Sequence, residues 1–138
     1  MNPSEQTQLY GLEKYFYEIT KLYNIGKMPN KILLSGKKGS GKSTLAYHVI
    51  NYVLSKLEVD KYDLEKLVIN QNNKSFKLLT NKTHPNFYLV DIIEEKKNIE
   101  ISQIRRMINY TNKSSFNDIP RFILIDNIEH LNKNSTNA

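Results

Sequence analysis

The sequence predicts an α/β domain with three layers, α/β/α, in which helices cover both faces of a parallel sheet. Two observations support this fold class. Short apolar runs of strand length alternate with segments whose apolar residues recur every three or four positions, as on a helix. One run, RFILID at 121–126, is almost unbroken in apolar character, as expected of a buried parallel strand. The 138 residues are enough for one domain with its own core.

The first helix is expected near the amino terminus, with Ser4 as its N-cap and Gly26 at its end. Its apolar face comprises Leu9, Leu12, Phe16, Ile19 and Tyr23. Pro29 then interrupts the chain, and KILLSG at 31–36 predicts a strand that leads into a glycine-rich loop. A second amphipathic helix follows the loop, with an apolar face of Leu45, Val49, Tyr52, Val53 and Leu57. We expect His48 on this helix to be exposed or half-buried.

Residues 58–83 are expected to form a long connection that is partly helical. The turn at 84–86 precedes FYLVDII at 87–93, a run rich in β-branched and aromatic residues that predicts a second strand. A third helix, with Ser102 as its cap, is expected to run to about Lys113, and its apolar face comprises Ile101, Ile104 and Ile108. The loop SSFNDIP then leads to the strand at 121–126. Strands thus alternate with helices along the chain.

Composition excludes several classes of protein. The chain has no cysteine, and His48, His84 and His130 are far apart in sequence, so neither a disulfide nor a zinc site is expected. No apolar run is long enough to cross a bilayer, and the start MNPSEQTQ does not resemble a signal peptide, which predicts a cytoplasmic protein with no membrane partner. The net charge of +6 suits a polyanionic partner, although solvated surface lysines are an equally good explanation.

The stretch GKKGSGKST at 36–44 has the spacing of a phosphate-binding loop (Walker A), placed between a predicted strand and a predicted helix. Such a loop turns backbone N–H groups toward a phosphate at the positive end of a helix dipole. We expect Lys42 to bind the β and γ phosphate oxygens of a nucleotide and Ser43 to ligate Mg²⁺. The predicted nucleotide-binding residues are Gly36, Gly39, Ser40, Gly41, Lys42, Ser43 and Thr44. The alternative is a flexible surface turn.

Asp126 ends the strand at 121–126, where a second carboxylate commonly contributes to the magnesium site, although an Asp in this place can also be a simple turn residue. In hydrolysing proteins of this kind a glutamate follows that aspartate and activates water. Here the next residue is Asn127, whose amide cannot accept a proton. If the next segment is helical, Glu129 points elsewhere and does not replace the base. The sequence therefore predicts nucleotide binding rather than efficient hydrolysis.

Four segments together resemble one family. In order and spacing they resemble segments of the delta-prime subunits of the bacterial DNA polymerase III clamp loader. The four segments are KMPNKILLSGKKGSGKSTLAYHVINYVL, HPNFYLVD, IEISQIRRMINY and PRFILIDNIEHLNKNSTNA. These subunits are AAA+ ATPases of the P-loop class and are similar to the gamma and tau subunits. The resemblance implies ATP and Mg²⁺ as ligands and a role in DNA replication. It also implies gamma/tau and delta subunits as partners, with the sliding clamp and primed DNA engaged through the complex.

The resemblance also implies that the helix bearing Arg105 and Arg106 faces DNA, although solvated arginines are an equally good explanation. Two departures from the family pattern are evident. The four-cysteine zinc module is absent or replaced by 58–83, and no sensor strand, lid or collar domain follows residue 138. We therefore expect 1–138 to be the amino-terminal part of one AAA+ domain, incomplete at its carboxyl end and marginally stable alone.

Three functions remain open at this point. The first is a clamp-loader subunit that binds ATP without hydrolysing it efficiently. The second is an active, DNA-stimulated ATPase of the same complex, in which Asn127 is tolerated or a neighbour completes the site. The third is a small P-loop kinase, which would need an arginine-bearing lid, and none of the arginines in this chain falls in an obvious one.

Overall fold

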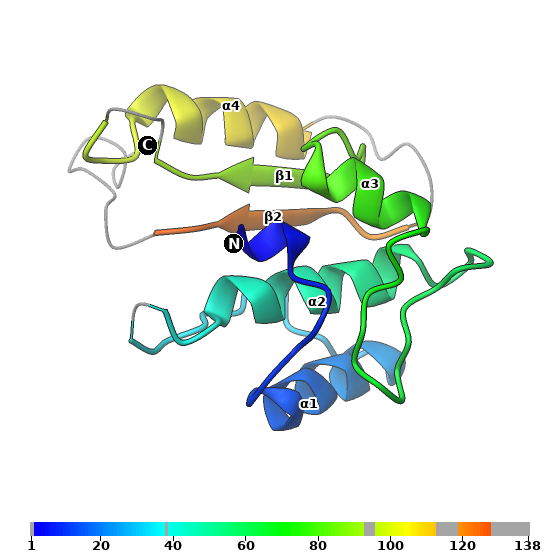
Figure 1. Ribbon diagram of the computed structural model, residues 1–138. Coiled ribbons are helices and arrows are strands. Elements are labelled where there is room, and N and C mark those ends of the chain that lie inside the picture. Colours follow the sequence, from blue (N-terminus) through cyan, green and yellow to red (C-terminus); the bar gives the residue numbers. More distant parts are fainter. Residues whose placement is uncertain (1, 38, 93–95, 113–118, 128–138) are drawn as a thin grey trace. The chain divides into compact units, whose positions relative to one another are not determined.

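The computed structural model describes residues 2–37, 39–92, 96–112 and 119–127 (Figure 1). The elements are η1 (Pro3–Glu5), α1 (Glu13–Asn24), α2 (Lys42–Leu54), α3 (Lys74–Thr80), β1 (Phe87–Val90), α4 (Ile101–Asn112) and β2 (Phe122–Ile125). They fall into two compact units, Met1–Asn81 and Lys82–Ala138. Both strands lie in the second unit, and the glycine-rich loop lies in the first.

The first unit is built around α2, which contacts η1, α1 and α3. Phe16 of α1 is fully buried and packs with Leu45 and Val49 of α2, as the apolar spacing predicts. Tyr15 and Tyr17 on either side of Phe16 are exposed. Because neighbours surround α2, its buried residues are not confined to one stripe, and the helix is less amphipathic than expected. Leu57 lies beyond the end of α2 and is 90% exposed, so its assignment to the apolar face is wrong.

The start of α1 differs from the prediction, whereas its end agrees with it. Ser4 is not the cap of α1: it lies in η1, whose N-cap is the side chain of Asn2. The helix cannot extend back to Ser4 because residues 7–9 are extended, with Ile69 N–H donating to Thr7 O and Leu9 N–H donating to Leu67 O. Gly26 ends α1 as predicted, with φ +71° and N–H groups at 26 and 27 returning to the last helical carbonyls.

The predicted strand at 31–36 is not observed. Among the described residues, none of 31–36 belongs to a strand, and Leu33 is 75% exposed. The apolar and β-branched residues of this run favour an extended backbone, but a strand also needs a neighbour for its N–H and C=O groups. Local sequence pattern does not provide that neighbour, and the prediction of a strand here is therefore wrong.

The connection at 58–83 is partly helical, as expected, because it contains α3. Asn73 caps this helix by accepting from Phe76 N–H, and the carboxylate of Glu58 accepts from the N–H groups of Lys74 and Ser75. Before α3, Asp63 and Val68 form an isolated antiparallel bridge. Leu67 and Ile69, which flank Val68, are buried in the core of the first unit. The polar connection is thus anchored by capping groups and two apolar side chains.

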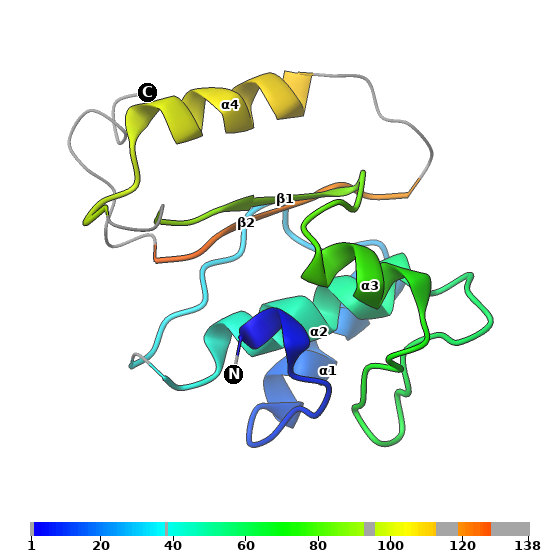
Figure 2. The ribbon, with the colours of Figure 1, turned by 45° about the horizontal axis from the view of Figure 1, so that its top comes forward.

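The second unit is an α/β arrangement with a parallel two-stranded sheet, which confirms the fold class at this level. Phe87 is aligned with Phe122 and Val90 with Ile125, and both strands point the same way in Figure 1. The helix α4 lies over one face of this sheet (Figure 2), where Ile104 packs with Val90 and Ile99. The strand β2 is half-buried along its length rather than fully buried as predicted.

The boundaries of α4 are set by residues that the sequence analysis did not select. Ser102 is not its cap, because Ser102 lies inside the helix. Instead, Gln103 Oε1 accepts from Glu100 N–H, which is one half of a capping box. At the other end, the Arg121 guanidinium donates to the carbonyls of Tyr110 and Thr111. The predicted end at Lys113 and most of the loop at 114–120 lie outside the described residues.

No helix within the described ranges is long and apolar enough to span a lipid bilayer.

Candidate functional site

The glycine loop leads directly into α2, whose N-cap is Gly41. Gly39 and Gly41 have φ angles of +83° and +88°, which side-chain-bearing residues rarely adopt. A Cβ at Gly41 would also lie 3.2 Å from Leu12 Cδ1. The N-cap residue Gly41 has no side chain to cap the helix, so the N–H groups of Lys42 and Thr44 remain available to an anion, at the end where the helix dipole is equivalent to about half a positive charge.

The side chain of Lys42 reaches back to the start of the glycine loop. Its Nζ donates to the carbonyl oxygen of Gly36 at 2.7 Å, so the ammonium group lies at the residue that begins the motif. Inside the loop, Ser40 N–H donates to Lys37 O at 3.1 Å, which forms a turn. A side chain at Gly36 would place its Cβ 3.1 Å from Ser40 Oγ. A side chain at Gly36 would thus displace the Ser40 hydroxyl by a few tenths of an ångström, and the loop presents backbone groups and one cation.

Thr44 and Ser43 lie in the first turn of α2. The hydroxyl of Thr44 donates to Gln6 Oε1 at 3.0 Å, and the residue is only 6% exposed. What Thr44 offers to a phosphate is therefore its backbone N–H, which has no partner within the helix at this position. Ser43 is half-buried at the neighbouring position. Of these two hydroxyl groups, that of Ser43 is the better candidate for a cation.

One turn further along α2, His48 is fully buried, which contradicts the expectation of an exposed or half-buried side chain. Its Nε2 lies 2.9 Å from Gln6 O and its Nδ1 lies 2.7 Å from the Tyr62 hydroxyl. A carbonyl oxygen only accepts, so Nε2 carries the proton and Nδ1 accepts from Tyr62. Burial lowers the pKa of His48 to about 4 and raises that of Tyr62. His48 is therefore a neutral structural group and not a base.

The carboxyl ends of β1 and β2 bring three polar side chains together in the second unit. Asp126 follows β2, and its N–H donates to Val90 O at 2.8 Å. Asp91 follows β1, and its Oδ1 accepts from Asn127 Nδ2 at 2.7 Å. Asn127 has a φ of +54°, and its own N–H donates to Asp126 Oδ1. The side-chain amide of Asn127 is thus bound to a carboxylate, and Gln103 Nε2 donates to Asp91 O beside it.

The structure groups the predicted residues in two places. The predicted nucleotide-binding residues lie at the start of α2 and in the loop before it: Gly36, Gly39, Ser40, Gly41, Lys42, Ser43 and Thr44. Asp126 lies in the second unit, as do Arg105 and Arg106, which are exposed on α4. Glu129 and His130 lie outside the described residues, as does Lys38 of the loop. No cluster of His, Cys, Asp or Glu suited to a metal ion occurs within the described part of the chain.

Sequence reasoning missed Gln6 and Asp91. Nothing in the local pattern links Gln6 to the loop, because its contacts with Thr44 and His48 are distant in sequence. A signal for Asp91 was present, since it follows one predicted strand as Asp126 follows another, and the carboxyl ends of parallel strands meet at one edge.

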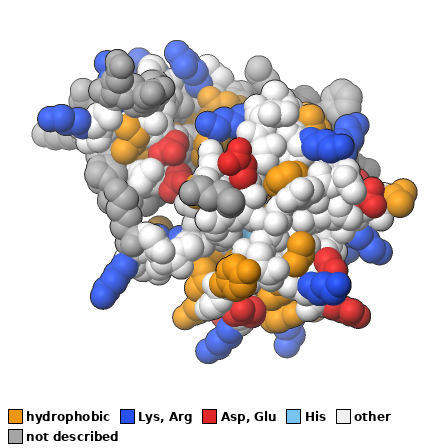
Figure 3. Space-filling model, in the orientation of Figure 1, with side chains coloured by type: hydrophobic (Ala, Val, Ile, Leu, Met, Phe, Trp, Pro, Cys, Tyr) orange, Lys and Arg blue, Asp and Glu red, His pale blue; other side chains and the backbone are white. Residues whose placement is uncertain are grey.

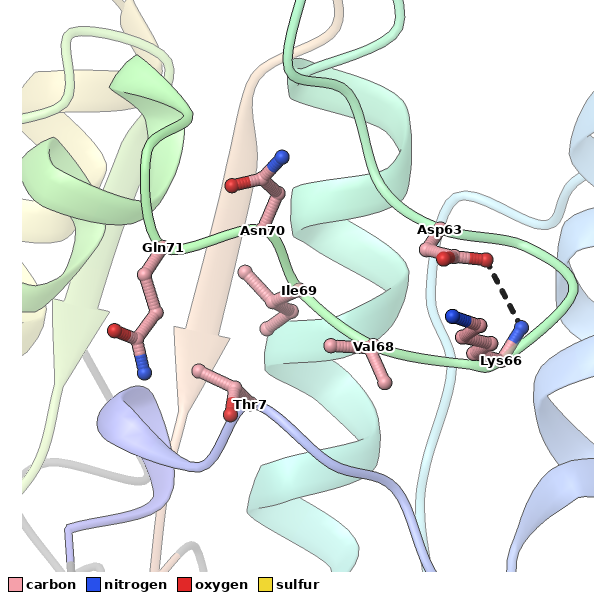
Figure 4. Close-up of a pocket in the computed structure, with 7 residues that line it drawn as sticks. All are labelled: Thr7, Asp63, Lys66, Val68, Ile69, Asn70 and Gln71. Carbon is pink, nitrogen blue, oxygen red and sulfur yellow. Dashed lines mark hydrogen bonds between the residues drawn. The ribbon is translucent and has the colours of Figure 1, made fainter.

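Each unit has a hollow among its described residues. The first, of about 380 Å³, is formed by Thr7, the turn around Asp63 and Lys66, and residues 68–71 (Figure 4). In it Asp63 Oδ1 accepts from Lys66 N–H, so this carboxylate stabilises the turn. The second, of about 410 Å³, is bordered by Asp91 and Gln103. On the face drawn in Figure 3, Lys and Arg side chains are spread among acidic and uncharged ones and form no single basic patch.

Comparison with known proteins finds a family that matches most of the chain. The family described as DNA polymerase III, delta subunit, matches residues 11–138, which is nearly the whole chain. No curated protein matches the chain. The chain belongs to the DNA polymerase III delta subunit family.

Proposed function

We propose that the chain binds ATP with Mg²⁺ at residues 36–44, as a delta-prime-type subunit of the bacterial clamp loader that hydrolyses ATP weakly or not at all. The observation that carries this proposal is the loop itself. A glycine turn leads into a helix with no side-chain cap, and Lys42 Nζ is folded onto Gly36 O. The N–H groups of Lys42 and Thr44, a helix dipole and one ammonium group are suited to a polyphosphate.

The residues present also suit the metal that accompanies ATP. Hydroxyl and carboxylate oxygens are the ligands that Mg²⁺ prefers, and it is commonly held together with phosphate oxygens. In this proposal Ser43 contributes the hydroxyl and Asp126 the carboxylate, acting through water. The bound ion would neutralise charge on the phosphates. We further infer that residues 1–138 are part of one three-layer AAA+ domain, supported by the family match and by the parallel order of β1 and β2.

Weak hydrolysis is inferred from the residue after Asp126. Asn127 cannot take a proton from water, and its Nδ2 is already bound to Asp91 Oδ1 at 2.7 Å. Family membership suggests association with other DNA polymerase III subunits. We propose that these partners are the gamma/tau and delta subunits, with the sliding clamp and primed DNA engaged through the complex, and that Arg105 and Arg106 face the DNA.

The test is a calorimetric titration of Mg·ATP into the 138-residue chain, its Lys42→Ala variant and a Lys37→Ala control. We expect micromolar binding that weakens about 10- to 100-fold in Lys42→Ala, because a hydrogen bond to a charged group contributes about 1.5–3 kcal/mol. Lys37 is exposed beside the loop, and its removal should change the affinity little. Absence of binding by the unmodified chain would contradict the proposal.

Steady-state turnover with and without primed DNA tests the weak hydrolysis. We expect no turnover above background in either condition. DNA-stimulated turnover that disappears in Lys42→Ala would instead show an active ATPase and would contradict the inference from Asn127.

A further inference from the structure

The amino-terminal segment contacts the start of α2 at two places. Leu12 Cδ1 covers Gly41, at 3.2 Å from the point where a Cβ would lie. Gln6 Oε1 accepts from the Thr44 hydroxyl at 3.0 Å, and Thr44 is buried at this contact. Both partners on α2 belong to the phosphate-loop motif, whereas Gln6 and Leu12 lie far from it in sequence. The loop is thus supported by a segment that the motif does not include.

Gln6 is itself fixed at its backbone. Its carbonyl oxygen accepts from His48 Nε2 at 2.9 Å, and the next residue, Thr7, accepts from Ile69 N–H at 2.8 Å. Thr44 and His48 are four residues apart and therefore lie on the same side of α2. The side-chain and backbone oxygens of Gln6 thus bind two successive turns of one helix face. Attachment at two points restricts rotation of the helix about its axis.

The first turn of α2 needs such a restraint because its N-cap residue provides no side-chain cap. A side-chain cap stabilises a helix start by accepting from an N–H group of the first turn, and α2 has none. A cap of that kind would occupy the N–H groups that a phosphate requires. A bond through the Thr44 hydroxyl stabilises the same turn and does not occupy the N–H groups of Lys42 and Thr44.

We propose that Gln6 is a positioning residue for the phosphate loop. It holds the first turn of α2 through the Thr44 hydroxyl, in the orientation in which the N–H groups of Lys42 and Thr44 meet a polyphosphate, and it does not itself touch the phosphate. This inference rests on the proposed nucleotide site. The ligand class is a nucleoside triphosphate, and the probe for it is Mg·ATP.

The test compares Gln6→Ala with Gln8→Ala. Gln8 lies in the same segment, but its Nε2 donates to Lys66 O and not to α2, so it is a matched control. Hydrogen exchange of the Leu45 N–H, which is bonded to Gly41 O, reports opening of the first turn without nucleotide. We expect Gln6→Ala to speed this exchange and to weaken Mg·ATP binding by about 2- to 10-fold, the range for one lost hydrogen bond. Gln8→Ala should change neither quantity.

Thr44→Val separates positioning from general support of the fold. If Gln6 acts through the Thr44 hydroxyl, Gln6→Ala should have no further effect on exchange or affinity in the Thr44→Val background. Equal behaviour of Gln6→Ala and Gln8→Ala, or full additivity of Gln6→Ala with Thr44→Val, would overturn the inference. A chain that binds no Mg·ATP would overturn the proposed function, whereas the exchange measurement, made without nucleotide, decides the Gln6 restraint separately.

Discussion

The side-chain amide of Asn127 donates a hydrogen bond of 2.7 Å to Asp91 Oδ1 and thereby joins the carboxyl ends of β1 and β2. The parallel register aligns Val90 with Ile125, so Asp91 and Asp126 are the first residues beyond the paired strands. Asn127 adopts a φ of +54°, a conformation that Asn tolerates better than most residues. Asn127 therefore has a structural role in this unit.

Asn127→Asp should lower the free energy of unfolding by about 1–3 kcal/mol at pH 7. The change keeps the shape of the side chain, removes the donor to Asp91 and places a second carboxylate beside it. The measurement is urea unfolding of the two chains. Asn109→Asp on the exposed side of α4 is the control for added charge, and it should have little effect. The paired change Asp91→Asn with Asn127→Asp should recover more than half of the loss, and no recovery would contradict the role given to this bond.

His48 should make stability depend on pH between about 6.5 and 4. Its pKa falls from 6.5 to about 4 on folding because the ring is buried, so in this window the unfolded chain binds a proton that the folded chain does not. Its contribution is complete above pH 6.5 and is lost as the pH falls. We expect the free energy of unfolding to decrease by about 2 kcal/mol between pH 7.5 and 5 on this account.

His48→Gln isolates this contribution, because it removes the His48 ring and leaves every other ionisable residue of the sequence in place. Urea unfolding at several pH values should give a smaller decrease for His48→Gln than for the unmodified chain. Parallel curves for the two chains would show that His48 does not change its pKa on folding.

Glu58→Gln should lower the free energy of unfolding by about 1 kcal/mol at low salt. The Glu58 carboxylate accepts from Ser75 Oγ and from N–H groups at the start of α3, where a negative charge interacts favourably with the helix dipole. Thermal unfolding in low and high salt measures the effect, which should shrink as salt is added. Glu65→Gln is the matched control, since Glu65 is exposed. A loss of the same size in the control would rule out a specific role for Glu58.

Elements with a strong local pattern could be predicted from the sequence. The stripe through Leu45 and Val49 predicts α2, and the apolar runs at 87–93 and 121–126 predict the two parallel strands. His48 was misjudged although it lies on that stripe, three residues after Leu45 and one before Val49. The polarity of the histidine ring favours an exposed position, whereas its place on the stripe favours burial. Its burial depends on hydrogen bonds to the Tyr62 hydroxyl and the Gln6 carbonyl, which are distant in sequence.

Features that depend on distant partners could not be predicted. The run at 31–36 has strand composition, but pairing depends on neighbours that local pattern does not specify. The sequence offers two neighbouring cap candidates at the amino terminus, Asn2 before Pro3 and Ser4. We predicted Ser4, whereas Asn2 is the cap of η1. The glycine loop could be predicted because a phosphate-binding loop requires this spacing of glycine, lysine and serine. Its support by Gln6 has no local signature.

The most direct test of the central claim is an NMR titration of the ¹⁵N-labelled 138-residue chain with magnesium and a non-hydrolysable ATP analogue. The account predicts that the largest amide shifts fall at Gly39, Gly41, Lys42, Ser43 and Thr44, and that Lys42→Ala reduces them at equal ligand concentration. Unchanged amide signals throughout 36–44 at millimolar ligand, or shifts confined to other parts of the chain, would contradict it.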